Sequence, residues 1–226
     1  VNAKQILKSY GIQIPIVTTL HGTDITLLGK DKSFKPVIEY AINMSDAVTV
    51  VSEDLKKETL DHFNVKKEIQ TVPNFIDMAL YKQAMDEQLR SNFAQEKESV
   101  ITHISNFRRV KRVKDVVRIF HKVNKEVPSK LLMIGDGPER INAEQLCREL
   151  GLESKVRFLG KLRVINKILA ISDVFILPSE TESFGLVALE AMASKTVVIS
   201  TNSGGIAEVN IDGKTGFLSE VGDIDK

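Results

Sequence analysis

The chain has 226 residues, of which 42% are hydrophobic and 6% aromatic, so it can bury a sizeable core in one large domain or two smaller ones. Lysine and arginine number 31 against 30 for aspartate and glutamate, and the net charge of +1 provides no broad attraction to nucleic acid or to an anionic membrane. No apolar run approaches the roughly 18 residues of a membrane span, and the first residues lack the apolar segment of a signal peptide. We therefore expect no nucleic-acid partner, no membrane partner and a cytoplasmic location.

Short runs rich in β-branched residues recur along the chain, and turn residues bound each of them. Such runs predict buried strands. Between them lie segments with apolar residues at three- and four-residue spacing, the pattern of amphipathic helices. This alternation predicts an α/β fold in which helices cover parallel sheets. The predicted strands are 14–19, 47–51, 69–72, 100–104, 131–134, 156–159, 174–177 and 196–200.

The polar, strand-poor stretch 79–98 predicts a linker between a first domain, 1–78, and a second domain, 99–226. The second domain has about five strand-helix units, enough for a doubly wound sheet with a binding crevice at the carboxyl ends of its strands. The first has about three strands, an unusually thin sheet. Because the chain also starts with valine and ends on a charged tail without a closing element, we expect it to be part of a longer protein. The active site is expected in the cleft between the domains.

The strongest chemical signal is the segment 178–193 (PSETESFGLVALEAMA), in which a strand ends in a polar turn that leads into a helix near Phe184 and Gly185. A glycine there lets the first N–H groups of the helix approach an anion such as a diphosphate, and the helix dipole adds partial positive charge. Glu182 precedes this helix and Glu190 lies inside it, so one carboxylate can contact a sugar and the other ribose hydroxyls. The alternative is that Glu182 is a helix cap and Glu190 a solvated helix residue.

A basic loop, 105–112 (SNFRRVKR), follows the strand 100–104. Its four cations can neutralise a leaving diphosphate, unless the loop is simply a solvated basic turn. The chain has one cysteine, Cys147, in an amphipathic stretch, so it offers neither a disulfide framework nor a cysteine-rich metal site. The cations would then do the work that a divalent ion does in metal-dependent sugar transferases.

Three further loops follow predicted strands. Glycines in 135–138 (GDGP) and 202–205 (NSGG) permit close backbone approach, although a tight strand-helix turn also explains them. In the first domain His21 precedes a glycine at a strand end and can hydrogen-bond a sugar hydroxyl or an acceptor, or can be structural. A possible Asp-x-Asp metal motif, Asp223 and Asp225, is interpreted as a turn and helix cap. Motifs of dehydrogenases, kinases and serine hydrolases are absent from the sequence.

The segment from Glu182 through Glu190 resembles the E-x7-E signature of the family 4 retaining glycosyltransferases. Within that family, TLHGTD and SNFRRVKR are most similar to the members that act in the first step of bacillithiol biosynthesis. The resemblance runs along nearly the whole chain, through the segments TLHGTD (19–24), VVSEDL (50–55), PNFID (73–77), SNFRRVKR (105–112), IGDGP (134–138), PSETESFGL (178–186) and TNSGGIAE (201–208).

The resemblance implies two Rossmann-like domains facing across a cleft (the GT-B fold), with the acceptor bound by the first and the nucleotide sugar by the second. It implies transfer of N-acetylglucosamine from UDP-GlcNAc to L-malate, with retention at the anomeric carbon and with no metal or other cofactor. The family's N-terminal glycine-rich loop and its C-terminal helices do not occur in the sequence. Part of the acceptor site is therefore expected to lie outside 1–226.

Residue roles are carried over by position. Lys111 matches the lysine that binds the diphosphate, and Glu190 the glutamate at the ribose. The family has arginine where Asn106 stands, so Arg108 is the candidate for the second cation, and the other arginines of the loop 105–112 stay open. The implied catalytic residues are His21, Arg108, Lys111 and Glu182; Thr23 would help to hold the acceptor, and the donor-binding residues would be Asn106, Gly135, Ser183, Phe184, Gly185, Leu186 and Glu190.

Two alternatives stay open. The first is a glycosyltransferase of the same fold with a lipid or glycan acceptor, which an exposed basic and apolar face on the first domain would favour. The second is a catalytically silent nucleotide-sugar-binding module, which a measurement of donor hydrolysis would distinguish from an enzyme. The sequence does not specify the oligomeric state.

Overall fold

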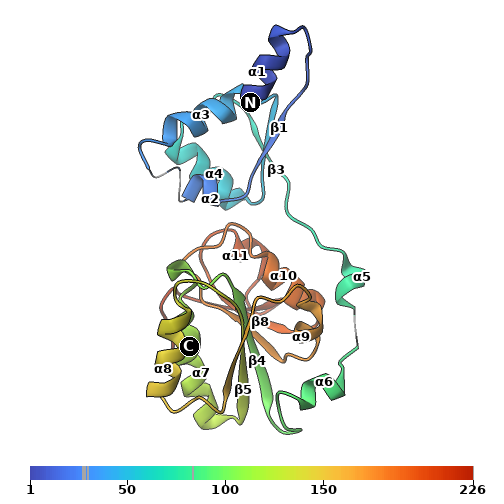
Figure 1. Ribbon diagram of the computed structural model, residues 1–226, viewed down its shortest axis with the longest axis vertical. Coiled ribbons are helices and arrows are strands. Elements are labelled where there is room, and N and C mark those ends of the chain that lie inside the picture. The colour runs from blue at the N-terminus through green and yellow to red at the C-terminus, as the bar shows by residue number, and fades with distance from the viewer. Residues whose placement is uncertain (27–28, 30, 83, 226) are drawn as a thin grey trace. The chain divides into compact units, whose positions relative to one another are not determined.

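The computed structural model describes residues 1–26, 29, 31–82 and 84–225, and the chain divides after Asn74 into two compact units (Figure 1). The segment 79–98, predicted as a linker, contains the short helix α6 (Glu87–Ser91) and most of α5 (Met78–Tyr81). Both belong to the second unit, because Tyr81 and Leu89 pack against its core. The boundary between the units therefore lies before α5.

Unit 1 is built around a three-stranded parallel sheet in the order β1-β2-β3. Its strands pair in register, with Val17 opposite Ala47 and Val48 opposite Ile69. Ser52 caps α4 by accepting a hydrogen bond from the Leu55 N–H at 3.1 Å. The elements are α1 (Asn2–Ser9), β1 (Val17–Leu20), α2 (Thr23–Thr26), α3 (Lys35–Met44), β2 (Ala47–Val50), α4 (Glu53–His62) and β3 (Ile69–Thr71).

Unit 2 is a six-stranded parallel sheet in the order β6-β5-β4-β7-β8-β9. Its strands are β4 (Ser99–Ser105), β5 (Ser129–Gly135), β6 (Val156–Gly160), β7 (Val174–Leu177), β8 (Val197–Thr201) and β9 (Gly216–Ser219). Its further helices are the 3-10 turn η2 (Arg109–Lys111), α7 (Val113–Glu126), α8 (Arg140–Glu149), α9 (Asn166–Ala170), α10 (Leu186–Ala193) and α11 (Ile206–Val209).

Helices cover both faces of this sheet (Figure 1). On one face α7 and α8 bury Val116, Phe120 and Cys147 in a single apolar cluster with residues of β5. On the other face α9, α10 and α11 bury a second cluster that includes Leu169 and Ala188. The predicted doubly wound α/β fold with parallel sheets is confirmed, and α7 is one of the segments between strands whose apolar residues have helical spacing.

Each of the eight predicted strands is present, with ends that differ by a few residues. The sequence did not predict β9, which pairs with β8 at the edge of the sheet. Edge strands need no continuous apolar run, and Phe217 in β9 is 56% exposed. None of the described helices combines the length and the apolar character needed to cross a membrane.

Candidate functional site

A cavity of about 470 Å³ lies at the carboxyl ends of the strands of unit 2. The strand order runs outward from β4 through β5 in one direction and from β7 through β8 in the other, so β4 and β7 flank the topological switch point. Doubly wound sheets bind their ligands at this place. The cavity is lined by Ile104, Ser105, Asn106, Lys111, Gly135, Asp136, Lys161, Leu177, Glu182, Gly185, Leu186 and Val187.

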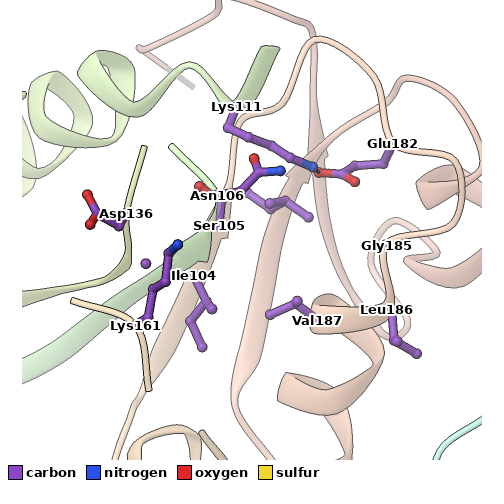
Figure 2. Close-up of a pocket in the computed structure, with 12 residues that line it drawn as sticks. Ile104, Ser105, Asn106, Lys111, Asp136, Lys161, Glu182, Gly185, Leu186 and Val187 are labelled. Atoms are coloured by element: carbon purple, nitrogen blue, oxygen red, sulfur yellow. Dashed lines mark hydrogen bonds and ion pairs between the residues drawn. The ribbon is translucent and has the colours of Figure 1, made fainter. Parts of the chain in front are cut away.

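Lys111 and Glu182 meet at this cavity, and Figure 2 shows their side chains pointing toward one another. The Lys111 ammonium donates to Glu182 Oε1 at 2.6 Å, and both side chains are largely buried, with exposed fractions of 19% and 12%. The buried Ser179 hydroxyl donates to the same oxygen at 2.7 Å. Two donors therefore fix the Glu182 carboxylate, and a cation stands where an anionic ligand would enter.

The loop that carries Lys111 is anchored by Phe107, which is fully buried although its φ is 39°. Its ring stacks on His103 with centroids 6.0 Å apart. Two glycines of the neighbouring loop make room for this backbone: a Cβ on Gly135 would lie 1.7 Å from the Ser105 carbonyl oxygen, and one on Gly137 would lie 2.1 Å from that of Asn106. The glycines of the GDGP loop thus allow two protein loops to pack closely.

The turn that carries Glu182 is held by the last residue of β8 and by the loop that follows it. Thr201 Oγ1 donates to the Ser179 carbonyl at 2.6 Å, and Ser203 Oγ donates to that of Glu180 at 2.7 Å. The N–H of Gly205 donates to the Glu182 carbonyl, also at 2.7 Å. The NSGG loop therefore positions the backbone of the Glu182 turn.

Gly185 is the N-cap of α10 and has a φ of +84°, in the left-handed region that favours glycine. A Cβ at this position would lie 2.1 Å from Cδ1 of Ile206, so a larger residue would also clash with α11. The first N–H groups of a helix have no carbonyl one turn earlier to bond. Because Gly185, Leu186 and Val187 line the cavity, those groups and the positive end of the helix dipole lie at its wall.

Glu190 lies one turn further along α10 and accepts a hydrogen bond from the Tyr81 phenol at 2.7 Å. Burial raises the pKa of the Glu190 carboxyl above its ordinary value, and the hydrogen bond from Tyr81 opposes this shift. Glu190 is not a solvated helix residue, which was the alternative left open by the sequence.

His103 is fully buried in β4 and precedes Ile104 and Ser105, which line the cavity. Its Nδ1 lies 2.8 Å from the Ile176 carbonyl, which can only accept, so Nδ1 carries the proton. Its Nε2 then accepts from the Ser105 hydroxyl at 2.8 Å. Burial, aided by the charge of Lys111, lowers the pKa of His103 to about 4, and the hydrogen bond to Ile176 opposes this shift.

This lowered pKa predicts an acid-sensitive fold. The unfolded chain binds a proton at His103 near pH 6.5 but the folded chain only near pH 4, so stability is complete above pH 6.5 and is lost as the pH falls. Asparagine at position 103 can still donate to Ile176 but does not titrate. The stability advantage of the wild type over His103→Asn should therefore shrink by about 2 kcal/mol between about pH 7.5 and about pH 5 in urea unfolding experiments. A difference independent of pH would contradict the buried neutral imidazole.

The cavity brings together six of the predicted site residues and leaves others elsewhere. Arg108 is exposed and does not line the cavity, and His21 and Thr23 are exposed residues of unit 1, where His21 directly follows β1. Ser183 and Phe184 adjoin the lining residues, and Phe184 is buried. The six are Asn106, Lys111, Gly135, Glu182, Gly185 and Leu186.

Sequence reasoning missed Lys161, Ser179 and Tyr81. Lys161 follows β6 and lines the cavity opposite the Lys111 loop (Figure 2). Its position directly after a predicted strand was the available signal. Ser179 similarly follows β7, whereas Tyr81 lies in the stretch interpreted as a linker and gave no signal.

The Asp-x-Asp motif forms a turn in which the Asp223 carboxylate accepts the Asp225 N–H at 3.0 Å. Asp225 also forms an ion pair with Lys122. The predicted turn is therefore present, whereas the predicted helix cap stays a prediction. Within the described parts of the chain, three or more His, Cys, Asp or Glu side chains nowhere form a group that could hold a metal ion.

Comparison with known structures shows the class of protein. The Anabaena protein HepE, solved in complex with UDP and glucose, superimposes with a TM-score of 0.84 and 24% identity, over 93% of this chain and 59% of that one. The chain thus has the GT-B glycosyltransferase fold. Residues 84–226 match the family model of the glycosyl transferases group 1, and residues 4–80 that of glycosyltransferase family 4. The group 1 model matches more than half of the chain, so the chain belongs to these glycosyltransferases, and the membership that the E-x7-E segment predicted is confirmed.

Two relatives of known sequence cover most of the chain. It is 50% identical to the N-acetyl-alpha-D-glucosaminyl L-malate synthase of Bacillus anthracis over 222 residues, which are 98% of this chain and 58% of the relative. It is 30% identical to an uncharacterized glycosyltransferase of Methanocaldococcus jannaschii, over 87% of this chain and 54% of that protein. The chain therefore spans little more than half the length of these relatives.

Proposed function

We propose that the intact protein is a retaining glycosyltransferase of the cytoplasm that transfers N-acetylglucosamine from UDP-GlcNAc to L-malate, without a metal or another cofactor. The observation that carries the choice of substrates is the 50% identity to the L-malate synthase over 98% of the chain. The cavity of unit 2 supports a nucleotide-sugar donor, because Lys111, Glu182 and the N-terminus of α10 line it at the topological switch point. Glu190, the second carboxylate of the E-x7-E segment, lies one turn further along α10.

In this proposal the donor diphosphate lies against the N-terminus of α10 and beside Lys111. The ammonium of Lys111 is within 2.6 Å of Glu182, so an arriving diphosphate competes with that carboxylate for the cation. Glu182 then contacts the donor sugar and Glu190 the ribose hydroxyls. Lys161, which also lines the cavity, adds a second positive charge, and Arg108 contributes if its exposed side chain turns inward.

The proposed chemistry breaks the bond between the anomeric carbon and the leaving phosphate oxygen while the malate hydroxyl attacks from the same face. The electron pair of the broken bond goes to the diphosphate, which Lys111 and the helix N-terminus stabilise electrostatically. An oxygen of the departing phosphate takes the proton of the malate hydroxyl. His21 of unit 1 would contact the sugar, and Thr23 the carboxylate of the acceptor.

A coupled assay for UDP release tests the substrates and the absence of a metal together. UDP-GlcNAc is supplied to the intact protein with L-malate, without an acceptor, and with L-malate plus a chelator. Release that depends on malate and persists in the chelator is expected. Release without malate dependence would redirect the search to a lipid or glycan acceptor, and donor binding without any release would indicate a silent binding module.

A further inference from the structure

A side chain outside the predicted site forms a hydrogen bond with Glu190, the second carboxylate of the E-x7-E segment. The Tyr81 phenol donates to Glu190 Oε1 at 2.7 Å, across 109 positions of sequence. Both side chains are partly buried, which protects the hydrogen bond from competition by water. One oxygen of the carboxylate is thereby held in a defined place.

The position of Tyr81 is fixed by the fold of unit 2. Its helix, α5, packs against α9 and α10, and the Tyr81 side chain contacts the apolar cluster on that face of the sheet. The Asn166 side-chain amide at the start of α9 donates to the carbonyl of Leu80 at 2.7 Å, which fastens the backbone next to Tyr81. The phenol is therefore in place before any ligand binds.

Glu190 shares a face of α10 with the cavity wall. Residues three and four apart on a helix are neighbours on its surface, and Val187 and Leu186 precede Glu190 by three and four positions. Both of them line the cavity. A carboxylate accepts several hydrogen bonds, so donation by Tyr81 leaves acceptor positions for the two hydroxyls of a ribose.

The Tyr81 phenol keeps its proton near neutral pH. Burial, together with the hydrogen bond to Glu190 and the charge of that carboxylate, raises the pKa of Tyr81 to about 12. The phenol therefore remains a donor.

We propose that Tyr81 is a positioning residue for the nucleotide: its hydroxyl holds the Glu190 carboxylate in the orientation that binds the ribose hydroxyls of the donor. The inference rests on the proposed role of Glu190 at the ribose. It adds to the site a residue from the segment between the two predicted domains. It also assigns a role to the Tyr81 hydroxyl, which the packing of the ring against the core does not need.

The test compares UDP with 2′,3′-dideoxy-UDP, which lacks the ribose hydroxyls, by isothermal titration of the intact protein. In the wild type UDP should bind more tightly. Tyr81→Phe keeps the ring but removes the hydroxyl, so it should reduce this preference about fivefold, the value of one ordinary hydrogen bond, and change the affinity for the dideoxy analogue less than about twofold. Tyr10→Phe is the matched control, because Tyr10 is 79% exposed in unit 1, and it should leave both affinities unchanged.

Glu190→Ala separates the two ways in which the inference can fail. If the wild type prefers UDP and Glu190→Ala abolishes the preference while Tyr81→Phe retains it, Tyr81 is not a positioning residue and the role of Glu190 stands. Equal losses of affinity for both nucleotides in Tyr81→Phe would show a purely structural tyrosine. A wild type that binds both nucleotides equally would overturn the ribose role of Glu190 together with the inference.

Discussion

Replacement of Lys111 by alanine is expected to lower the turnover of the intact protein by about 10²–10³-fold, the usual effect of removing one preorganised charge from a transition state. Lys111 is the cation that meets Glu182 at the cavity wall, and in the proposed mechanism it stabilises the departing diphosphate. The variant should remain folded, since the Ser179 hydroxyl still donates to Glu182. Single-turnover UDP release and urea unfolding measure the two effects separately.

Two further variants make this result specific. Lys111→Arg keeps the positive charge and should retain more activity than alanine. Lys125→Ala removes the same charge from an exposed position in the last turn of α7, away from the cavity, and should leave turnover within about twofold of the wild type. Near-normal turnover of Lys111→Ala would remove this lysine from the mechanism.

Most of the fold could be predicted because local pattern and tertiary structure agree in unit 2. The segment 113–126 has an apolar stripe at helical spacing, and it forms a helix whose stripe, including Val116 and Phe120, is buried. The strand Gly216–Ser219 escaped prediction because edge pairing with β8 supplies its stability, and no sequence pattern marks that pairing. The same reason explains α5, a four-residue helix held by contacts with α9 and α10.

The candidate site was predictable where the candidate residues themselves form the turn after a predicted strand. Glu182 and Gly185 stand in a turn after a strand, and the sequence alone placed them at the ligand crevice. The sequence could not show that Lys111 pairs with Glu182, because that contact joins positions 71 apart. It also could not show that the glycines at 135 and 137 make room for the backbone of another loop. The cleft between the domains, with His21 and Thr23, stays a prediction.

Gly204→Ala is expected to destabilise the protein by about 3 kcal/mol or more and to weaken donor binding, although residue 204 itself is not among the residues that line the cavity. Gly204 has a φ of +77°, and it forms a parallel bridge with Glu182. A Cβ there would lie 2.4 Å from the Glu182 carbonyl oxygen, so the turn must shift. Because this turn presents the Glu182 carboxylate, its displacement should lower the affinity for UDP-GlcNAc roughly tenfold or more.

The strain of the left-handed backbone and the clash with the Glu182 turn can be separated by a matched glycine. Gly213 has a φ of +69°, almost the same conformation, but a Cβ there would meet nothing within 4 Å. Gly213→Ala should therefore cost only about 1–2 kcal/mol, the strain of the left-handed backbone alone, and leave donor affinity unchanged. Urea unfolding and titration with UDP-GlcNAc of both variants measure the difference. Equal effects of the two substitutions would show that the contact between Gly204 and the Glu182 turn contributes nothing, whereas a loss of donor binding confined to Gly204→Ala would show that the loop after β8 positions Glu182 for the donor.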